Sequence, residues 1–149
     1  MNADTIFSIA NASVMPFWLL LLVAPRWRGT DVLVHGPIAV VLLAPLYAYM
    51  LFGYPGPSEP LDFSTLDAVV RGFSVPHNVV GGWIHYLIFD LFIGAWESRD
   101  ARRHGVPHLF VVPCLILTLM LGPLGLLAYV IVRFATKRKT RFQENAVAA

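Results

Sequence analysis

The sequence has few charged residues, a single cysteine and no polar segment long enough to fold as a soluble domain. Lys, Arg, Asp and Glu make up 13% of the 149 residues, and hydrophobic residues make up 57%. This balance lies outside the range of ordinary soluble domains. Because Cys114 has no second cysteine to pair with, an intramolecular disulfide is excluded. The composition therefore indicates a single-domain membrane protein.

Basic residues are too few and too scattered for a nucleic-acid surface. The formal net charge is +2, and the Lys and Arg residues lie beside the ends of apolar stretches. Cations in such positions are typical of membrane anchors, so we expect no nucleic-acid partner. The first apolar stretch lacks the basic n-region of a secretory signal, since only Asp4 is charged before it. We expect it to be retained as a span.

Four long apolar stretches dominate the chain. Each approaches or exceeds the roughly 20 residues that a helix needs to cross hydrocarbon. Spans of this length must be helices, because a helix satisfies its own backbone hydrogen bonds where no water is present. We predict an all-α polytopic membrane protein with one transmembrane domain over residues 1–136. Its bundle of about four transmembrane helices has spans at about 6–24, 32–52, 78–96 and 106–134.

Proline, glycine and capping residues predict the connections between spans. Kinks are expected at Pro37 and Pro45, and the three prolines and two glycines of 53–60 indicate a loop. Ser64-Thr65-Leu66-Asp67 resembles a capping box and predicts a short interfacial helix at about 64–72. Residues 137–149 form a polar, basic tail.

The last apolar stretch is too long for one straight span and too short for two. Residues 106–134 would make a helix about 43 Å long, against a hydrocarbon core of about 30 Å. Pro113 and the Gly122–Gly125 break therefore predict one kinked, tilted or partly unwound helix. On that prediction, five arginines flank one membrane surface and six Lys or Arg residues the other, so the positive-inside rule gives no orientation.

Two ionisable residues lie deep in the third span. An Asp at the middle of a membrane helix costs about 2.5–3.5 kcal/mol on insertion scales unless it faces protein or water. At 100° per residue, Asp90 projects near Tyr86 and Glu97. His85 projects with Phe89, about 140° away. As a functional pair, Asp90 would be an acid and His85 a base. The structural alternative is that Asp90 pairs with an arginine or caps a broken helix, while His85 bonds a backbone carbonyl.

Aromatic residues are abundant around this pair. They could line a slot for a flat apolar ligand such as a polyene, or simply face lipid and the membrane interfaces. Such residues are Phe17, Trp18, Trp83, Tyr86, Phe89, Phe92, Trp96 and Phe110. The candidate catalytic residues are Asp90 and His85, and the candidate substrate-binding residues are Trp83, Tyr86, Phe89, Trp96 and Glu97.

A second polar cluster at the end of the third span offers oxygen and nitrogen ligands for a metal. It consists of Glu97, Asp100, His104 and His108. Gly105 and Pro107 interrupt the helical register between the two histidines, and an ion-paired helix end accounts for the cluster without a metal. His35 and His85 share no feature but depth that would make them haem ligands. We expect no metal and no other cofactor.

The third and fourth stretches also carry a specific run of residues. His85 to Trp96 reads His-Tyr-x-x-x-Asp-Leu-Phe-x-Gly-x-Trp, followed by Arg99-Asp100-Ala101 and by Leu121-Gly122-Pro123-Leu124-Gly125. Further matches lie at 7–11, 25–27 and 62–66. In these residues, over nearly its whole length, the sequence resembles the abscisic-acid-deficient-four-like family.

The resemblance implies a role in carotenoid or related isoprenoid metabolism. The family's plant reaction turns the epoxide of violaxanthin into the allene of neoxanthin, an isomerisation that needs an acid and a base but formally no redox cofactor. It would use Asp90 as acid and His85 as base. A non-enzymatic pigment- or lipid-binding or assembly protein is the alternative.

Expected partners are membrane lipids, a carotenoid or isoprenoid ligand and further copies of the chain. Because the sequence shows no Ser- and Arg-rich transit peptide, we expect a bacterial inner membrane.

Overall fold

The computed structural model describes residues 2–55 and 62–137, and every regular element in these ranges is a helix. The elements are α1 (Ala3–Val23), α2 (Arg28–Leu33), α3 (Ile38–Ala48), the π-helical turn η1 (Tyr49–Gly53), α4 (Leu66–Phe73), α5 (Pro76–His104), α6 (His108–Leu121) and α7 (Pro123–Lys137). The predicted all-α fold is confirmed. Part of the loop expected at 53–60, and the tail after residue 137, lie outside the described residues.

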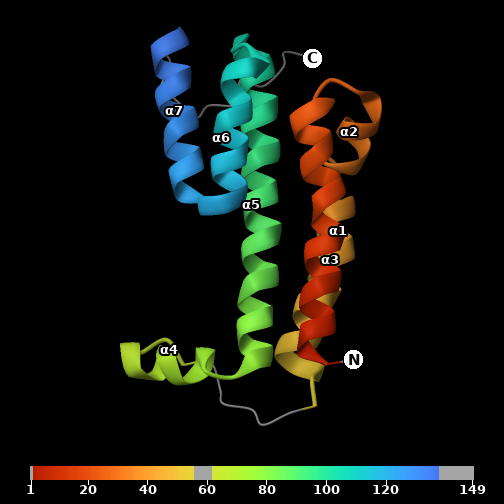
Figure 1. Ribbon diagram of the computed structural model, residues 1–149, viewed down its shortest axis with the longest axis vertical. Coiled ribbons are helices and arrows are strands. Elements are labelled where there is room, and N and C mark those ends of the chain that lie inside the picture. Colours follow the sequence, from red (N-terminus) through yellow and green to blue (C-terminus); the bar gives the residue numbers. More distant parts are fainter. Residues whose placement is uncertain (1, 56–61, 138–149) are drawn as a thin grey trace, which may run out of the picture.

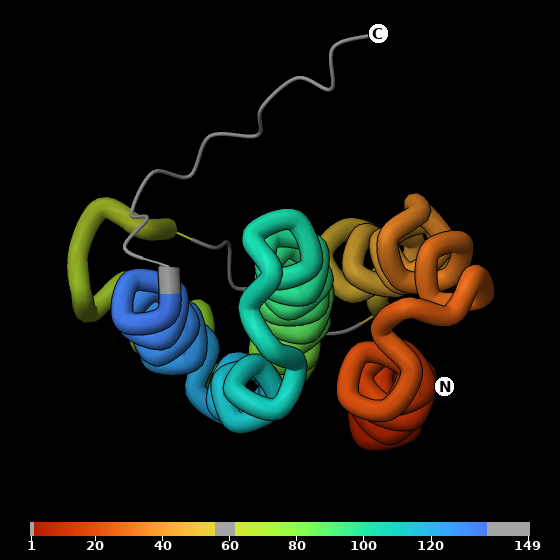
Figure 2. Tube along the Cα trace, turned by 90° about the horizontal axis from the view of Figure 1, so that it is seen from above, coloured from red at the N-terminus to blue at the C-terminus, as the bar shows by residue number. Residues whose placement is uncertain are grey.

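Helix α5 is the central element, and α1, α3, α6 and α7 all pack against it (Figures 1 and 2). It begins with Pro76 in the first turn, where the missing N–H leaves no hydrogen bond unmade. It ends at Gly105, whose φ of 66° is the left-handed conformation of a helix C-cap. At 29 residues, α5 is about 43 Å long, so it crosses the hydrocarbon core with its charged last turn outside.

Three helical segments among the described residues are long and apolar enough to cross a membrane. They are Ala3–Val23, Arg28–Gly53 and Pro76–His104. The second is interrupted at residues 34–37, between α2 and α3, so a break does occur at the predicted Pro37. Pro45 stays inside α3. The short helix predicted at 64–72 is α4, where the Thr65 hydroxyl accepts a hydrogen bond from the Ala68 N–H at 3.2 Å.

The last apolar stretch differs from its prediction, because residues 106–134 form two helices and not one kinked helix. Helix α6 ends at Leu121, and α7 begins at Pro123 and runs back beside α6 (Figure 1). Gly122 makes the reversal with a φ of 44°, a conformation that favours glycine, and Pro123 has no N–H to continue α6. At Gly125, a Cβ atom would overlap the backbone of Thr118, so glycine permits this close packing.

The α6–α7 hairpin is too short to add two spans. Helix α6 has 14 residues and α7 has 15, which is about 21–23 Å each against a core of about 30 Å. Its turn lies beside the middle of α5, and both of its ends lie at the same end of the bundle as the C-terminus of α5 (Figure 1). The hairpin therefore enters and leaves the membrane on one side.

This reversal decides the distribution of positive charge that the single-helix prediction left balanced. Six of the seven described arginines, which are Arg26, Arg28, Arg99, Arg102, Arg103 and Arg133, belong to the end of the bundle that holds α2 and the C-terminus of α5. Arg71 of α4 is at the opposite end. By the positive-inside rule, we expect the arginine-rich end to face the cytoplasm and the N-terminus of α1 to lie on the other side.

Candidate functional site

The site residues predicted on α5 divide between two sides of the helix. One set borders cavities between α3 and α5: Trp83, His85, Tyr86 and Phe89. The other set contacts the α6–α7 hairpin: Asp90, Trp96 and Glu97. His85 and Asp90 are thus kept apart, as their predicted angular separation requires.

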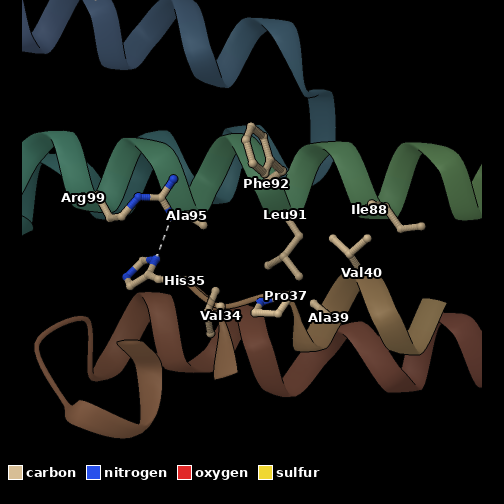
Figure 3. Close-up of a pocket in the computed structure, with 11 residues that line it drawn as sticks. Val34, His35, Pro37, Ala39, Val40, Ile88, Leu91, Phe92, Ala95 and Arg99 are labelled. Carbon is tan, nitrogen blue, oxygen red and sulfur yellow. Dashed lines mark hydrogen bonds between the residues drawn. The ribbon is translucent and has the colours of Figure 1, made fainter. Parts of the chain in front are cut away.

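The first side forms one groove, which we name the α3–α5 groove, from three cavities that share lining residues. The largest, of about 620 Å³, extends towards α4 and meets a second cavity of about 280 Å³ at Tyr47 and His85. The second shares Val40 and Phe92 with a third cavity of about 270 Å³, which ends at Arg99 (Figure 3). The three cavities thus follow one another along α5.

The length and lining of the α3–α5 groove suit a long, thin, apolar molecule. Its lining positions on α5 extend from Asn78 to Arg99, which is about 30 Å of helix and matches the hydrocarbon thickness of a bilayer. Phe89 and Phe92 on the groove are each 56% exposed and therefore face lipid in a membrane. A ligand can enter this groove sideways from the bilayer.

His85 lies at the boundary of the first and second cavities of the groove. Its ring stacks on Phe89 with centroids 4.5 Å apart and lies 5.9 Å from the ring of Tyr47. The side chain is exposed to the groove. An imidazole in this position can exchange a proton with a bound molecule.

Trp83 and Tyr86 form a rigid aromatic wall in the largest cavity. The two rings stack with centroids 5.2 Å apart. The indole N–H of Trp83 donates to Asn11 Oδ1 of α1 at 3.0 Å, and the Tyr86 hydroxyl donates to the Leu119 carbonyl of α6 at 3.2 Å. Since each ring is tied to a different helix, the wall is held in place by the bundle itself.

Asp90 lies at the turn of the α6–α7 hairpin. Its side chain is 9% exposed, and its Oδ2 atom has no hydrogen-bond partner in the described part of the chain. A Cβ atom on Gly122 would lie 2.9 Å from Asp90 Oδ1, so the carboxyl contacts the backbone where α7 begins. The partial positive charge of a helix N-terminus favours a carboxylate there. This position suits the structural alternative, in which Asp90 caps a broken helix, although no backbone N–H of the described residues donates a hydrogen bond to its carboxyl. Tyr86, which lines the groove, also lies beside Asp90.

The polar residues further along α5 hold the hairpin. The Thr118 hydroxyl of α6 donates to Glu97 Oε1 at 2.9 Å. Asp100 accepts a hydrogen bond from the Tyr129 hydroxyl and pairs with Arg133 Nε at 3.1 Å. All five of these residues are buried. Trp96 packs edge-on against Tyr129, with ring centroids 5.6 Å apart.

The four residues considered as metal ligands all have partners within the protein, and Asp100 and His104 share Arg133. His104 Nε2 lies 3.1 Å from a terminal nitrogen of Arg133, and His108 Nε2 lies 2.9 Å from the Leu22 carbonyl of α1. Within residues 2–55 and 62–137, no three His, Cys, Asp or Glu side chains converge on a point that would hold a metal ion. The sequence analysis missed Tyr129 and Arg133 as partners of Asp100, because only the reversal at Gly122 brings them back to α5.

The sequence analysis also missed the polar end of the groove. Arg99 of α5 lies with a terminal nitrogen 3.2 Å from Nδ1 of His35, a residue 64 positions earlier. Arg102, one turn from Arg99, pairs with Asp31 of α2 at 3.0 Å. The available signal was helical spacing, because Arg99 follows Phe92 and Ala95 on the groove side of α5. Nothing local in the sequence links it to His35.

Fold and site define the class: a polytopic helical membrane protein with a re-entrant hairpin and a lipid-facing groove along its central helix. Residues 5–129 match the family described as ABA DEFICIENT 4-like, and the chain belongs to that family. This confirms the resemblance seen in the sequence.

The chain is similar to Protein ABA DEFICIENT 4, chloroplastic, of Arabidopsis thaliana. The two are 25% identical over 142 residues, which cover 91% of this chain. The chain spans 61% of the length of that relative. No solved structure shows significant similarity to the chain.

Proposed function

We propose that this protein binds a long polyene of the carotenoid or isoprenoid class in the α3–α5 groove and isomerises it by acid–base catalysis. The observation that carries the proposal is the groove itself, which is apolar, open to lipid and about 30 Å long. A linear isoprenoid that crosses the hydrocarbon core fits such a groove. Membership of the ABA DEFICIENT 4-like family supports the choice of a carotenoid.

The proposed chemistry is the opening of an epoxide without net oxidation or reduction. An acid protonates the epoxide oxygen as the C–O bond breaks, and a base removes a proton from the polyene. His85 is the base, because its ring reaches the groove. Asp90 is the acid. It does not line the groove itself and acts through Tyr86, which lines the groove and lies beside Asp90. The ring faces of Trp83 and Phe89 stabilise transient positive charge on the polyene.

A pigment- or lipid-binding protein without catalysis is the second candidate function. The position of Asp90 favours it, because a carboxylate at the start of α7 has a structural role that needs no substrate. In either case the ligand comes from the membrane, which we propose to be a bacterial inner membrane.

Substitution of His85 tests the catalytic proposal. In a carotenoid-producing host, His85→Gln is expected to lower conversion about 100-fold, since a general base contributes 10²–10⁴-fold to a rate. Asp90→Asn is expected to lower it as well. The pigment profile by chromatography is the readout, with the amount of folded protein measured alongside.

His77→Gln is the matched control for this experiment. His77 lies on the same helix but is buried against the ring of Tyr54, at 5.3 Å, and does not line the groove. Its substitution should leave the pigment profile unchanged. Unchanged profiles in both His85→Gln and Asp90→Asn would rule out the isomerase, whereas pigment that copurifies unaltered would favour the binding protein.

A further inference from the structure

The third cavity of the α3–α5 groove has a polar end that the proposed chemistry does not use. Figure 3 shows Arg99 and His35 facing each other at this end, with Leu91, Val40 and Ile88 further along. The His35 side chain is only 6% exposed. An apolar cavity that closes on two nitrogen-bearing side chains at the membrane surface has the form of a site for an amphiphilic molecule.

The contact between these two side chains fixes the chemistry of the histidine. A guanidinium has donors only, so Arg99 donates and His35 Nδ1 accepts. An imidazole that accepts at Nδ1 is neutral and carries its proton on Nε2. His35 Nε2 is buried without a hydrogen-bond partner, since the nearest carboxylate oxygen, Asp31 Oδ1, is 3.9 Å away.

Both side chains at this end therefore offer N–H donors. Among the described residues, no Asp or Glu lines the third cavity. Arg102 lies close by and adds positive charge, although Asp31 pairs with it at 3.0 Å. The complementary ligand group is an acceptor oxygen, such as a hydroxyl, carbonyl or phosphate oxygen, at the end of an apolar chain.

We propose that Arg99, held by His35, binds the oxygenated end group of the molecule whose apolar chain lies in the α3–α5 groove. This inference rests on the proposed function, because it takes the groove as the site of a long isoprenoid. It sets the direction of the ligand, with the oxygenated end at the arginine-rich surface and the polyene passing His85. The third cavity lies next to the second and shares Val40 and Phe92 with it, and this adjacency selects the occupant.

The test compares two carotenoids that differ only at their ends. Zeaxanthin and β-carotene share one polyene, and zeaxanthin adds a hydroxyl to each ring. Each is titrated into the full chain in phosphatidylcholine nanodiscs, and binding is followed by quenching of tryptophan fluorescence. The wild type should bind zeaxanthin at least about tenfold more tightly, as expected for a hydrogen bond to a charged group. Arg99→Met should lower zeaxanthin affinity to that of β-carotene.

Arg103→Met is the matched control, because Arg103 is exposed on the same helix and does not line the groove. It should retain the preference for zeaxanthin. A preference that survives Arg99→Met overturns this inference and leaves the groove proposal intact. Failure of both carotenoids to bind overturns the proposed function itself. If phosphatidylglycerol in the nanodisc abolishes zeaxanthin binding by the wild type, the end site belongs to a lipid phosphate and the inference is overturned.

Discussion

A cysteine at position 136 is expected to react with a membrane-impermeant maleimide only after cells are opened, whereas a cysteine at position 64 reacts in intact cells. Ser64 and Thr136 are both exposed, and they lie at opposite ends of the bundle. From Ser64 to Thr136 the chain crosses the membrane once, through α5, because the α6–α7 hairpin returns to the side it came from. The positive-inside rule predicts that the arginine-rich end, which includes Thr136, faces the cytoplasm.

The labelling is done in a Cys114→Ala background, so that each variant carries one thiol. Cys114 is 2% exposed, and its removal excludes labelling of the native thiol. Total labelling after permeabilisation serves as the control for both positions. If α6 and α7 instead formed one full span, positions 64 and 136 would lie on the same side and would react together, which would contradict the hairpin.

Arg133→Met is expected to destabilise the protein by about 3–5 kcal/mol, because it leaves Asp100 as a buried charge without its partner. Arg133 is 1% exposed and Asp100 is 6% exposed, so water cannot readily replace the lost contact. The pair joins α7 to α5, and its loss should loosen the hairpin. The measurement is the free energy of unfolding of the purified protein in mixed detergent micelles.

Tyr129→Phe provides the graded comparison for the same network. It removes one hydrogen bond to Asp100 but keeps the ring that packs against Trp96, so a smaller loss of about 1.5–3 kcal/mol is expected. Asp100→Asn combined with Arg133→Met should recover part of the stability, since no buried charge is then left alone. Equal stability of Arg133→Met and the wild type would show that the network does not hold the hairpin.

Local sequence signals were sufficient to predict those helix ends that a proline, a glycine or a capping residue marks. Pro76 and Gly105 bound α5, and Thr65 begins α4, because a first-turn proline, a left-handed glycine and an N-cap act over a few residues. The reversal at Gly122 was not predicted, because the same Gly-Pro pair can kink a helix or end it. The positive φ of Gly122 and the close packing of Gly125 on Thr118 distinguish the two outcomes in the structure.

The candidate site could be predicted in part for the same reason. Helical periodicity correctly separates His85 from Asp90 around α5, but it does not say which helix covers each face. The pairing of Arg99 with His35 depends on how α2 and α3 pack against α5, and the position of Asp90 depends on the hairpin. The assignment of His85 and Asp90 as base and acid stays a prediction.

The most direct test of the central claim, that the α3–α5 groove holds a long isoprenoid, is the identity of what copurifies with the protein. The wild-type chain would be purified gently, extracted with organic solvent and analysed by absorbance and mass spectrometry. We predict a polyene in near-stoichiometric amount, with an oxygenated end group. An extract that contains only bulk phospholipid would contradict the claim.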